Sequence, residues 1–202
     1  MKKVIYLSDL SLPNKSAYAV HVIKMCEAFV ANGFNAQLIV NNINTNFYSI
    51  KKKYNLYKNF KILGLQRFKA NTFFTRFQNA YKIFFILRKS KADLIISRNI
   101  LASLLLSFFN IKNLLEIHTE LKGFTKIIFH FTYKIIKKDN LKFIFIHNKL
   151  NDHFKINKKN YIVLDDAVKI ENFSKFKKKV KIIKEKNLFI LVVLLTVKVL
   201  KL

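Results

Sequence analysis

Residues 1–40 alternate between an apolar run, a polar loop, an amphipathic segment and a second apolar run. The run 4–7 predicts a buried strand, and the segment from about Ser16 to Gly33 predicts a helix that ends at the glycine. The apolar positions expected on this helix are Ala17, Val20, Ile23, Met25, Ala28 and Phe29. A second strand over 36–40 completes a β-α-β unit, which joins parallel strands. The loop after the first strand therefore opens at the carboxyl edge of the sheet, where open α/β folds bind ligands.

Strand and helix signals keep alternating along the rest of the chain. We expect strands over 60–63, 94–97, 114–118, 143–146 and 161–164, and helices over 68–87, 100–109 and 122–138 with a short one from about 148. Segments 41–46 and 50–59 are expected to be irregular links. This alternation predicts an α/β, Rossmann-like domain with about seven mostly parallel strands and helices on both faces.

Composition limits the classes of protein. A chain of 202 residues with 51% hydrophobic residues is one ordinary domain, or one domain and a fragment. The single cysteine, Cys26, allows no intramolecular disulfide, and we expect it to be a core residue. The apolar runs are shorter than the ~18–20 residues of a membrane span, and the first is too short for a signal peptide, so the expected location is the cytoplasm.

The net charge of +27 arises almost entirely from lysine. Lysine, asparagine, isoleucine and phenylalanine all have A/T-rich codons, so we interpret much of the excess as the imprint of an A/T-rich genome. The alternative is attraction to a polyanion, either nucleic acid or an anionic bilayer. The helical segments within 68–89 and 124–138 mix aromatic and aliphatic residues with lysine. One face of each would be core, and a basic amphipathic helix can also rest on the inner membrane.

Several common sites are excluded by their missing motifs. No G-x-G-x-x-G or Walker sequence is present, and the five histidines are not spaced as a zinc site. We therefore expect neither a nucleotide cofactor nor a metal.

The candidate site residues lie near strand ends and the first helix. His118 ends an apolar strand, Arg98 follows another, and His21 lies in the first turns of the helix. Arginine binds anions bidentately, and a helix N-terminus favours them. The candidate substrate-binding residues are Ser16, His21, Arg98 and Glu120. Their structural alternatives are a helix cap for Ser16, a partly buried helix residue for His21 and a surface ion pair for Arg98.

Four segments in a fixed order carry a resemblance to a known family. The first contains Pro13, Ser16-Ala17, His21-Val22, Met25 and Gly33-Phe34. The others are 93–98 (DLIISR), 115–118 (LEIH) and 163–168 (VLDDAV) with Phe173 after it. Together they resemble family 4 glycosyltransferases, which have the two-domain GT-B fold. One departure is Ala167, where that family usually has glycine.

The resemblance implies that this chain is the N-terminal, acceptor-side half of a GT-B enzyme. His118 would face the transferred sugar and is the candidate catalytic residue. The intact enzyme would transfer a sugar from a nucleotide-sugar to a cell-envelope glycan or lipid-linked acceptor, without a metal. Because the second domain holds the donor in this family, the chain is expected to be inactive alone and to need a separate donor domain.

The last residues predict a truncation. We expect a glycosyltransferase-like domain over 1–173, a lysine-rich linker over 174–186 and a remnant of the donor domain's first strand over 187–202. If residues 187–202 are back-translated with A/T-favouring codons and the result is read one base out of frame, the codons permit a glycine and a lysine-glycine pair at the spacing of such a strand. The alternative is a natural short protein with an apolar last strand. From a different functional class, the runner-up for the whole chain is a basic, non-enzymatic protein that binds nucleic acid or an anionic membrane.

Overall fold

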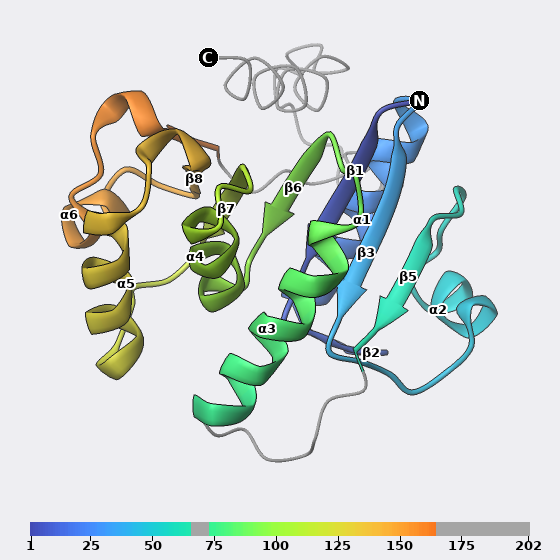
Figure 1. The fold of residues 1–202 in the computed structure, drawn as a ribbon. Coiled ribbons are helices and arrows are strands. Elements are labelled where there is room, and N and C mark those ends of the chain that lie inside the picture. The colour runs from blue at the N-terminus through green and yellow to red at the C-terminus, as the bar shows by residue number, and fades with distance from the viewer. Residues whose placement is uncertain (66–72, 165–202) are drawn as a thin grey trace, which may run out of the picture.

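The computed structural model describes residues 1–65 and 73–164 (Figure 1). Its main sheet has seven strands in the order β5-β3-β1-β6-β7-β8-β9. All neighbouring strands of this sheet are parallel. The strands are β1 (Lys3–Leu7), β3 (Asn35–Val40), β5 (Lys61–Gly64), β6 (Leu94–Ser97), β7 (Asn113–Ile117), β8 (Leu141–Phe145) and β9 (Tyr161–Val163). The predicted α/β class and the parallel, seven-stranded sheet are confirmed.

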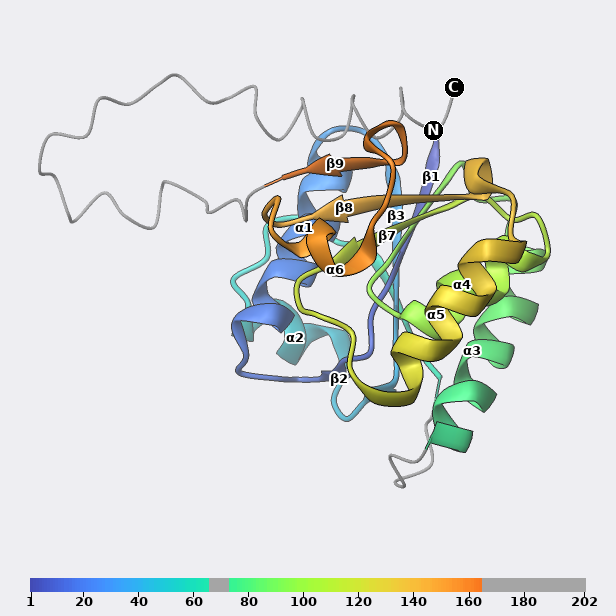
Figure 2. The same cartoon turned by 90° about the vertical axis from the view of Figure 1, so that its left-hand side faces the viewer.

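Helices cover both faces of this sheet. The longer ones are α1 (Ala17–Ala31), α3 (Phe73–Arg88), α4 (Ile100–Phe108) and α5 (Gly123–Ile135). The shorter ones are α2 (Phe47–Lys53), α6 (Leu150–Phe154) and the 3₁₀ turns η1 (Lys138–Asn140) and η2 (Lys158–Asn160). Figure 2 shows α3, α4 and α5 side by side on one face and α1 and α2 on the other. Within the described ranges, no helix is long and apolar enough to cross a membrane.

The link between β3 and β5 is more regular than predicted. Asn42–Ile43 forms the short strand β4, which pairs in parallel with β2 (Ser11–Leu12), where we expected a loop. The segment expected to be irregular after it begins inside helix α2, in which Ile50 is buried. Asn46 caps this helix, because its side chain accepts a hydrogen bond of 2.9 Å from the Ser49 amide. A helix stabilised by one cap and one buried residue is too short to show helical periodicity.

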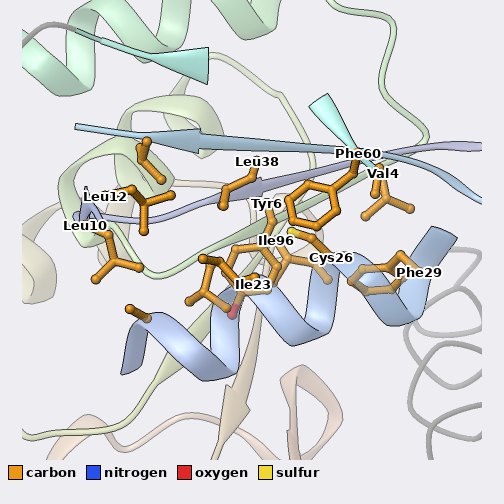
Figure 3. Packing of buried hydrophobic residues seen from close by; sticks show 14 of the residues in the cluster. Val4, Tyr6, Leu10, Leu12, Ile23, Cys26, Phe29, Leu38, Phe60 and Ile96 are labelled. Carbon is orange, nitrogen blue, oxygen red and sulfur yellow. The ribbon is translucent and has the colours of Figure 1, made fainter. Parts of the chain in front are cut away.

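Helix α1 buries a face slightly different from the predicted one. The buried apolar residues are Ala19, Val22, Ile23, Cys26 and Phe29. Val20, expected in the core, is 43% exposed. Figure 3 shows Ile23 and Cys26 facing Tyr6 and Ile96 of the sheet, with Phe29 farther along the helix in the same core. Cys26 is therefore a core residue as predicted, and burial raises the pKa of its thiol well above the usual range.

The alternation of side chains along the strands separates the core on the α1 face from two hydrophobic clusters on the other face. Tyr6, Ile96 and Leu114 pack on the α1 face, whereas Ile5, Ile95 and Leu115 pack toward α3, α4 and α5. Side chains alternate between the two faces with a period of two. The residue two positions after Ile96 and the residues two and four positions after Leu114 therefore also point to the α1 side.

The end of the chain carries predictions that the structure does not address. The linker over 174–186 and the tail over 187–202 lie outside the described residues, as does most of the segment 163–173. The same holds for the first part of the helix expected over 68–87.

Candidate functional site

The centre of the site is the carboxylate of Glu116 in β7, whose side chain is 6% exposed. Its Oε1 atom accepts a hydrogen bond from His118 Nε2 and lies 3.2 Å from His21 Nε2. Its Oε2 atom accepts a hydrogen bond from the Tyr6 hydroxyl, and Arg98 Nη1 lies 3.9 Å from Oε1. We call these five residues the Glu116 cluster.

Strand register explains why residues so far apart in sequence meet here. Tyr6 of β1 is in register with Ile96 of β6, which is in register with Leu114 of β7. Arg98 and Glu116 follow two residues later on the same face, and His118 two residues after that. Helix α1 crosses this face and adds His21, whose ring lies 5.6 Å from the ring of His118.

The electrostatics of the cluster keep Glu116 ionised. Burial alone would raise the pKa of this carboxyl group, but hydrogen bonds from His118 and His21 and the charge of Arg98 together hold it well below its usual range. Burial and the neighbouring carboxylate raise the pKa of Tyr6 well above its usual range. At neutral pH the cluster therefore contains a buried anion, a phenol that donates to it, and a guanidinium nearby.

Arg98 is held on two sides. Its guanidinium carbon lies 3.9 Å from the centre of the Tyr18 ring, and its side chain is only 10% exposed. Tyr18 is held in turn, because its hydroxyl accepts a hydrogen bond of 2.7 Å from Ser8. The surface ion pair considered as an alternative for Arg98 is therefore wrong. Its guanidinium is largely buried and faces a buried carboxylate.

A cavity of about 780 Å³ opens beside the Glu116 cluster, and His118 forms part of its wall. It lies at the carboxyl edge of the sheet, between the residues that follow β7 and β8 and the first turns of α3 and α5. The other lining residues are Arg76, Ile100, Thr119, Glu120, Leu121, Lys122, Thr125, His147 and Leu150. An arginine, a lysine, two histidines and two threonine hydroxyls in one cavity suit a ligand with phosphate and hydroxyl groups.

The predicted site residues fall into three places. His21, Arg98 and His118 meet around Glu116, at the sheet edge where they were expected. Glu120 lines the cavity, and its carboxylate lies 2.9 Å from His153 Nε2. Ser16 caps α1, accepting a hydrogen bond of 3.2 Å from the Ala19 amide, and is not among the residues of the cluster or the cavity.

Sequence reasoning missed the two residues that hold the cluster together. From the sequence, Glu116 stood out only as part of the 115–118 motif, and Tyr6 only as part of the apolar run 4–7. The available signal was a glutamate between Leu115 and Ile117 inside an apolar strand. A charged residue in a buried strand needs a partner, so such a position predicts a polar cluster.

The cluster also contains a possible set of metal ligands. One ligand atom from each of His21, Glu116 and His118 lies within 4.8 Å of the others. Two imidazoles and a carboxylate suit zinc or iron. However, Arg98 places a positive charge 3.9 Å from the same carboxylate oxygen, which opposes a divalent cation. We therefore interpret the group as a hydrogen-bonded network.

Comparison with known proteins identifies the fold. No family model and no curated protein matches the sequence. Among solved structures, a glycosyltransferase from Rickettsia africae ESF-5 matches with a TM-score of 0.60 and 15% identity, over 88% of this chain and 46% of that one. The UDP-N-acetylglucosamine 2-epimerase from Rickettsia bellii matches with a TM-score of 0.57 and 13% identity, over 95% of this chain and 51% of that one. The domain has the fold of one half of a GT-B protein.

A third neighbour has the same relationship to the chain. WaaG, a glycosyltransferase involved in lipopolysaccharide biosynthesis, matches with a TM-score of 0.51 and 11% identity, over 80% of this chain and 44% of that one. The chain thus spans about half the length of each of the three structures. At such low identity these matches establish the GT-B half as a fold, while the chemistry has to be argued from the residues.

Proposed function

We propose that this domain is the acceptor-side half of a glycosyltransferase that transfers a sugar from a nucleotide-sugar to a cell-envelope glycan or lipid-linked acceptor at the inner membrane. The observation that carries this proposal is the cationic cavity at the carboxyl edge of the sheet, with His118 in its wall and a buried carboxylate behind it. The GT-B fold and the two glycosyltransferase neighbours support the proposal.

In the proposed reaction, an acceptor hydroxyl attacks the anomeric carbon of the donor sugar. The bond from that carbon to the nucleotide diphosphate breaks, the diphosphate leaves with the electron pair, and the hydroxyl proton passes to a phosphate oxygen of the leaving diphosphate. His118 contacts the reacting sugars from the cavity wall. Glu116 orients the imidazole, because its ionised carboxylate accepts the Nε2 hydrogen bond.

The other residues of the cavity and the Glu116 cluster bind the acceptor or position the carboxylate of Glu116. Arg76 and Lys122 contact the acceptor's phosphate groups, while Glu120 accepts hydrogen bonds from sugar hydroxyls. His21 and Arg98 act through Glu116 by fixing its carboxylate. A substrate contact by Ser16 stays a prediction. Negative charge on the leaving diphosphate has to be stabilised by a donor-binding half that faces this edge.

The proposal is tested by the binding of a soluble acceptor analogue. We expect a short-chain isoprenyl diphosphate that carries one N-acetylglucosamine to bind the chain weakly, as measured by calorimetry. Arg76→Gln and Lys122→Gln should each weaken binding about tenfold, because each removes a charge-assisted hydrogen bond worth about 1.5 kcal/mol or more. Lys158→Gln, at an exposed position of η2, is the matched control and should bind as the unaltered chain does.

Two results would contradict the acceptor-side assignment. The first is that all three variants bind the analogue as tightly as the unaltered chain does, which would show that the analogue does not bind in the cavity. The second is tight binding of a nucleotide-sugar to this cavity, because the donor half should hold that ligand.

The runner-up function, a basic protein that binds nucleic acid, predicts a lysine-lined groove. Exposed lysines instead occur on opposite sides of the domain, for example Lys52 on α2 and Lys126 on α5. We therefore expect DNA binding to be weak and independent of sequence. It should fall by orders of magnitude between about 50 and 200 mM salt, because counterion release alone drives it. Fluorescence anisotropy with two unrelated duplexes would measure this. A sequence preference that persists at the higher salt would favour the runner-up.

A further inference from the structure

The outer surface of α3 carries a stripe of large apolar side chains that the fold does not bury. Phe74, Phe77, Tyr81 and Phe85 are 67%, 47%, 51% and 41% exposed. Their spacing of three, four and four residues places them on one side of the helix. The neighbouring side of the helix supplies the core residues Ala80, Ile83, Phe84 and Leu87. The helix thus has a complete core face and a second apolar face.

Helix α5 repeats this pattern at the same spacing. Phe124, Ile127, Phe131 and Ile135 are 58%, 64%, 68% and 57% exposed. Helix α4 packs against both α3 and α5, and the three form one layer in Figure 2. At the end of α4, Phe108 and Phe109 are 52% and 50% exposed. We call the exposed apolar residues of α3, α4 and α5 the aromatic face.

The charged residues of α3, α4 and α5 are all basic. None of the three helices contains an aspartate or a glutamate. Their basic residues are Arg76, Lys82, Arg88, Lys126 and Lys134. Soluble proteins rarely expose large apolar patches, and basic residues beside exposed apolar side chains are complementary to an anionic surface.

We propose that the aromatic face docks on an anionic lipid bilayer, with the two apolar stripes in the headgroup region and the basic side chains against the lipid phosphates. Ile127 and Ile135 favour hydrocarbon, since they have no ring to stack on a nucleic-acid base. On both α3 and α5, basic side chains lie beside the exposed apolar stripe. Helices that lie in the membrane interface have the same combination of an apolar face and flanking basic residues.

The aromatic face is continuous with the cavity. Arg76, one residue before Phe77, lines the cavity, and so do Lys122 and Thr125 on either side of Phe124. A docked domain would therefore open its cavity close to the lipid headgroups. This orientation deepens the proposed function, on whose lipid-linked acceptor it rests, by defining the side from which that acceptor enters.

Co-sedimentation with vesicles tests the docking. We expect the full chain to bind phosphatidylcholine vesicles that contain phosphatidylglycerol at about a third of the lipid, and to bind pure phosphatidylcholine at least about tenfold more weakly. The variant Phe77→Ser/Phe85→Ser/Ile127→Ser/Phe131→Ser should lose at least about tenfold in affinity, because four buried contacts with lipid disappear. Lys82→Gln/Lys126→Gln/Lys134→Gln should lose affinity for the anionic vesicles alone.

The matched control is Tyr48→Ser/Tyr57→Ser, which removes side chains that are 73% and 66% exposed away from this layer. This control should bind vesicles as the unaltered chain does. Equal binding by the four-residue variant would overturn the proposal. So would a concentration-dependent dimer, seen by light scattering, that the four-residue variant abolishes, because the face would then join two copies. The acceptor-analogue titration contains no vesicles, so docking and acceptor binding can fail independently.

Discussion

Glu116→Ala is expected to lower the free energy of unfolding by about 3–5 kcal/mol, the usual cost of removing one partner from a buried ionic group. The substitution removes the acceptor for Tyr6 and His118 and leaves Arg98 without its carboxylate. Urea denaturation followed by circular dichroism measures the change. Glu120→Ala, at an exposed carboxylate, is the control and should change stability by about 0.5 kcal/mol or less. Equal stability of the two variants would show that the Glu116 cluster contributes little to folding.

The same carboxylate predicts a pH dependence of stability. Because the folded-state pKa of Glu116 lies below that of the unfolded chain, its contribution is complete above the unfolded value of about 4.3. The contribution is then lost as the pH falls toward the folded value. We expect the unaltered chain to lose more stability below about pH 4.3 than Glu116→Gln does, since glutamine does not titrate. Parallel curves for the two proteins would contradict this assignment.

Phe143→Ala is expected to cost about 3–5 kcal/mol, the usual range for deleting a buried phenylalanine. Phe143 of β8 is fully buried, and its ring lies 6.0 Å from Phe129 and 5.5 Å from Tyr133, both on α5. The cavity left by this substitution would loosen the helix that supplies one wall of the candidate site. Because the cost comes from lost packing, it should appear in urea denaturation at any pH where the protein is folded.

Phe131→Ala is the matched control for this prediction. It removes the same side chain from an exposed position of the same helix, where Phe131 is 68% exposed. It should change stability by no more than about 0.5 kcal/mol. A loss as large as that of Phe143→Ala would mean that the aromatic face is part of the core, and would count against membrane docking.

Much of the fold could be predicted because apolar periodicity is strong in long elements. The strands over 4–7, 36–40 and 94–97 were expected within a residue or two of β1, β3 and β6. The short elements could not be predicted in this way. β2 and β4 have two residues each, and α2 depends on the Asn46 cap, so neither produces a repeating pattern.

The candidate site was predictable in its location but not in its centre. Reading β-α-β units placed His21, Arg98 and His118 at one sheet edge, because parallel strands end on the same side. The alternation of side chains along β7 places Glu116 on the same face as His118. It does not say which of Glu116 and Glu120 is buried, because the two are an even number of residues apart. Glu116 follows the face covered by α1, whereas Glu120 lies beyond the strand and lines the cavity.

The sequence by itself determined the α/β class, the order of the long elements and the edge at which chemistry-bearing residues gather, because each depends on local periodicity and on strand direction. Only the tertiary structure decided that one carboxylate is shared by Tyr6, His21 and His118, since packing and strand register set those contacts. It also decided which apolar residues of α3 and α5 stay outside the core. Both helices are apolar on more than one side, and the sheet can bury only the side that faces it.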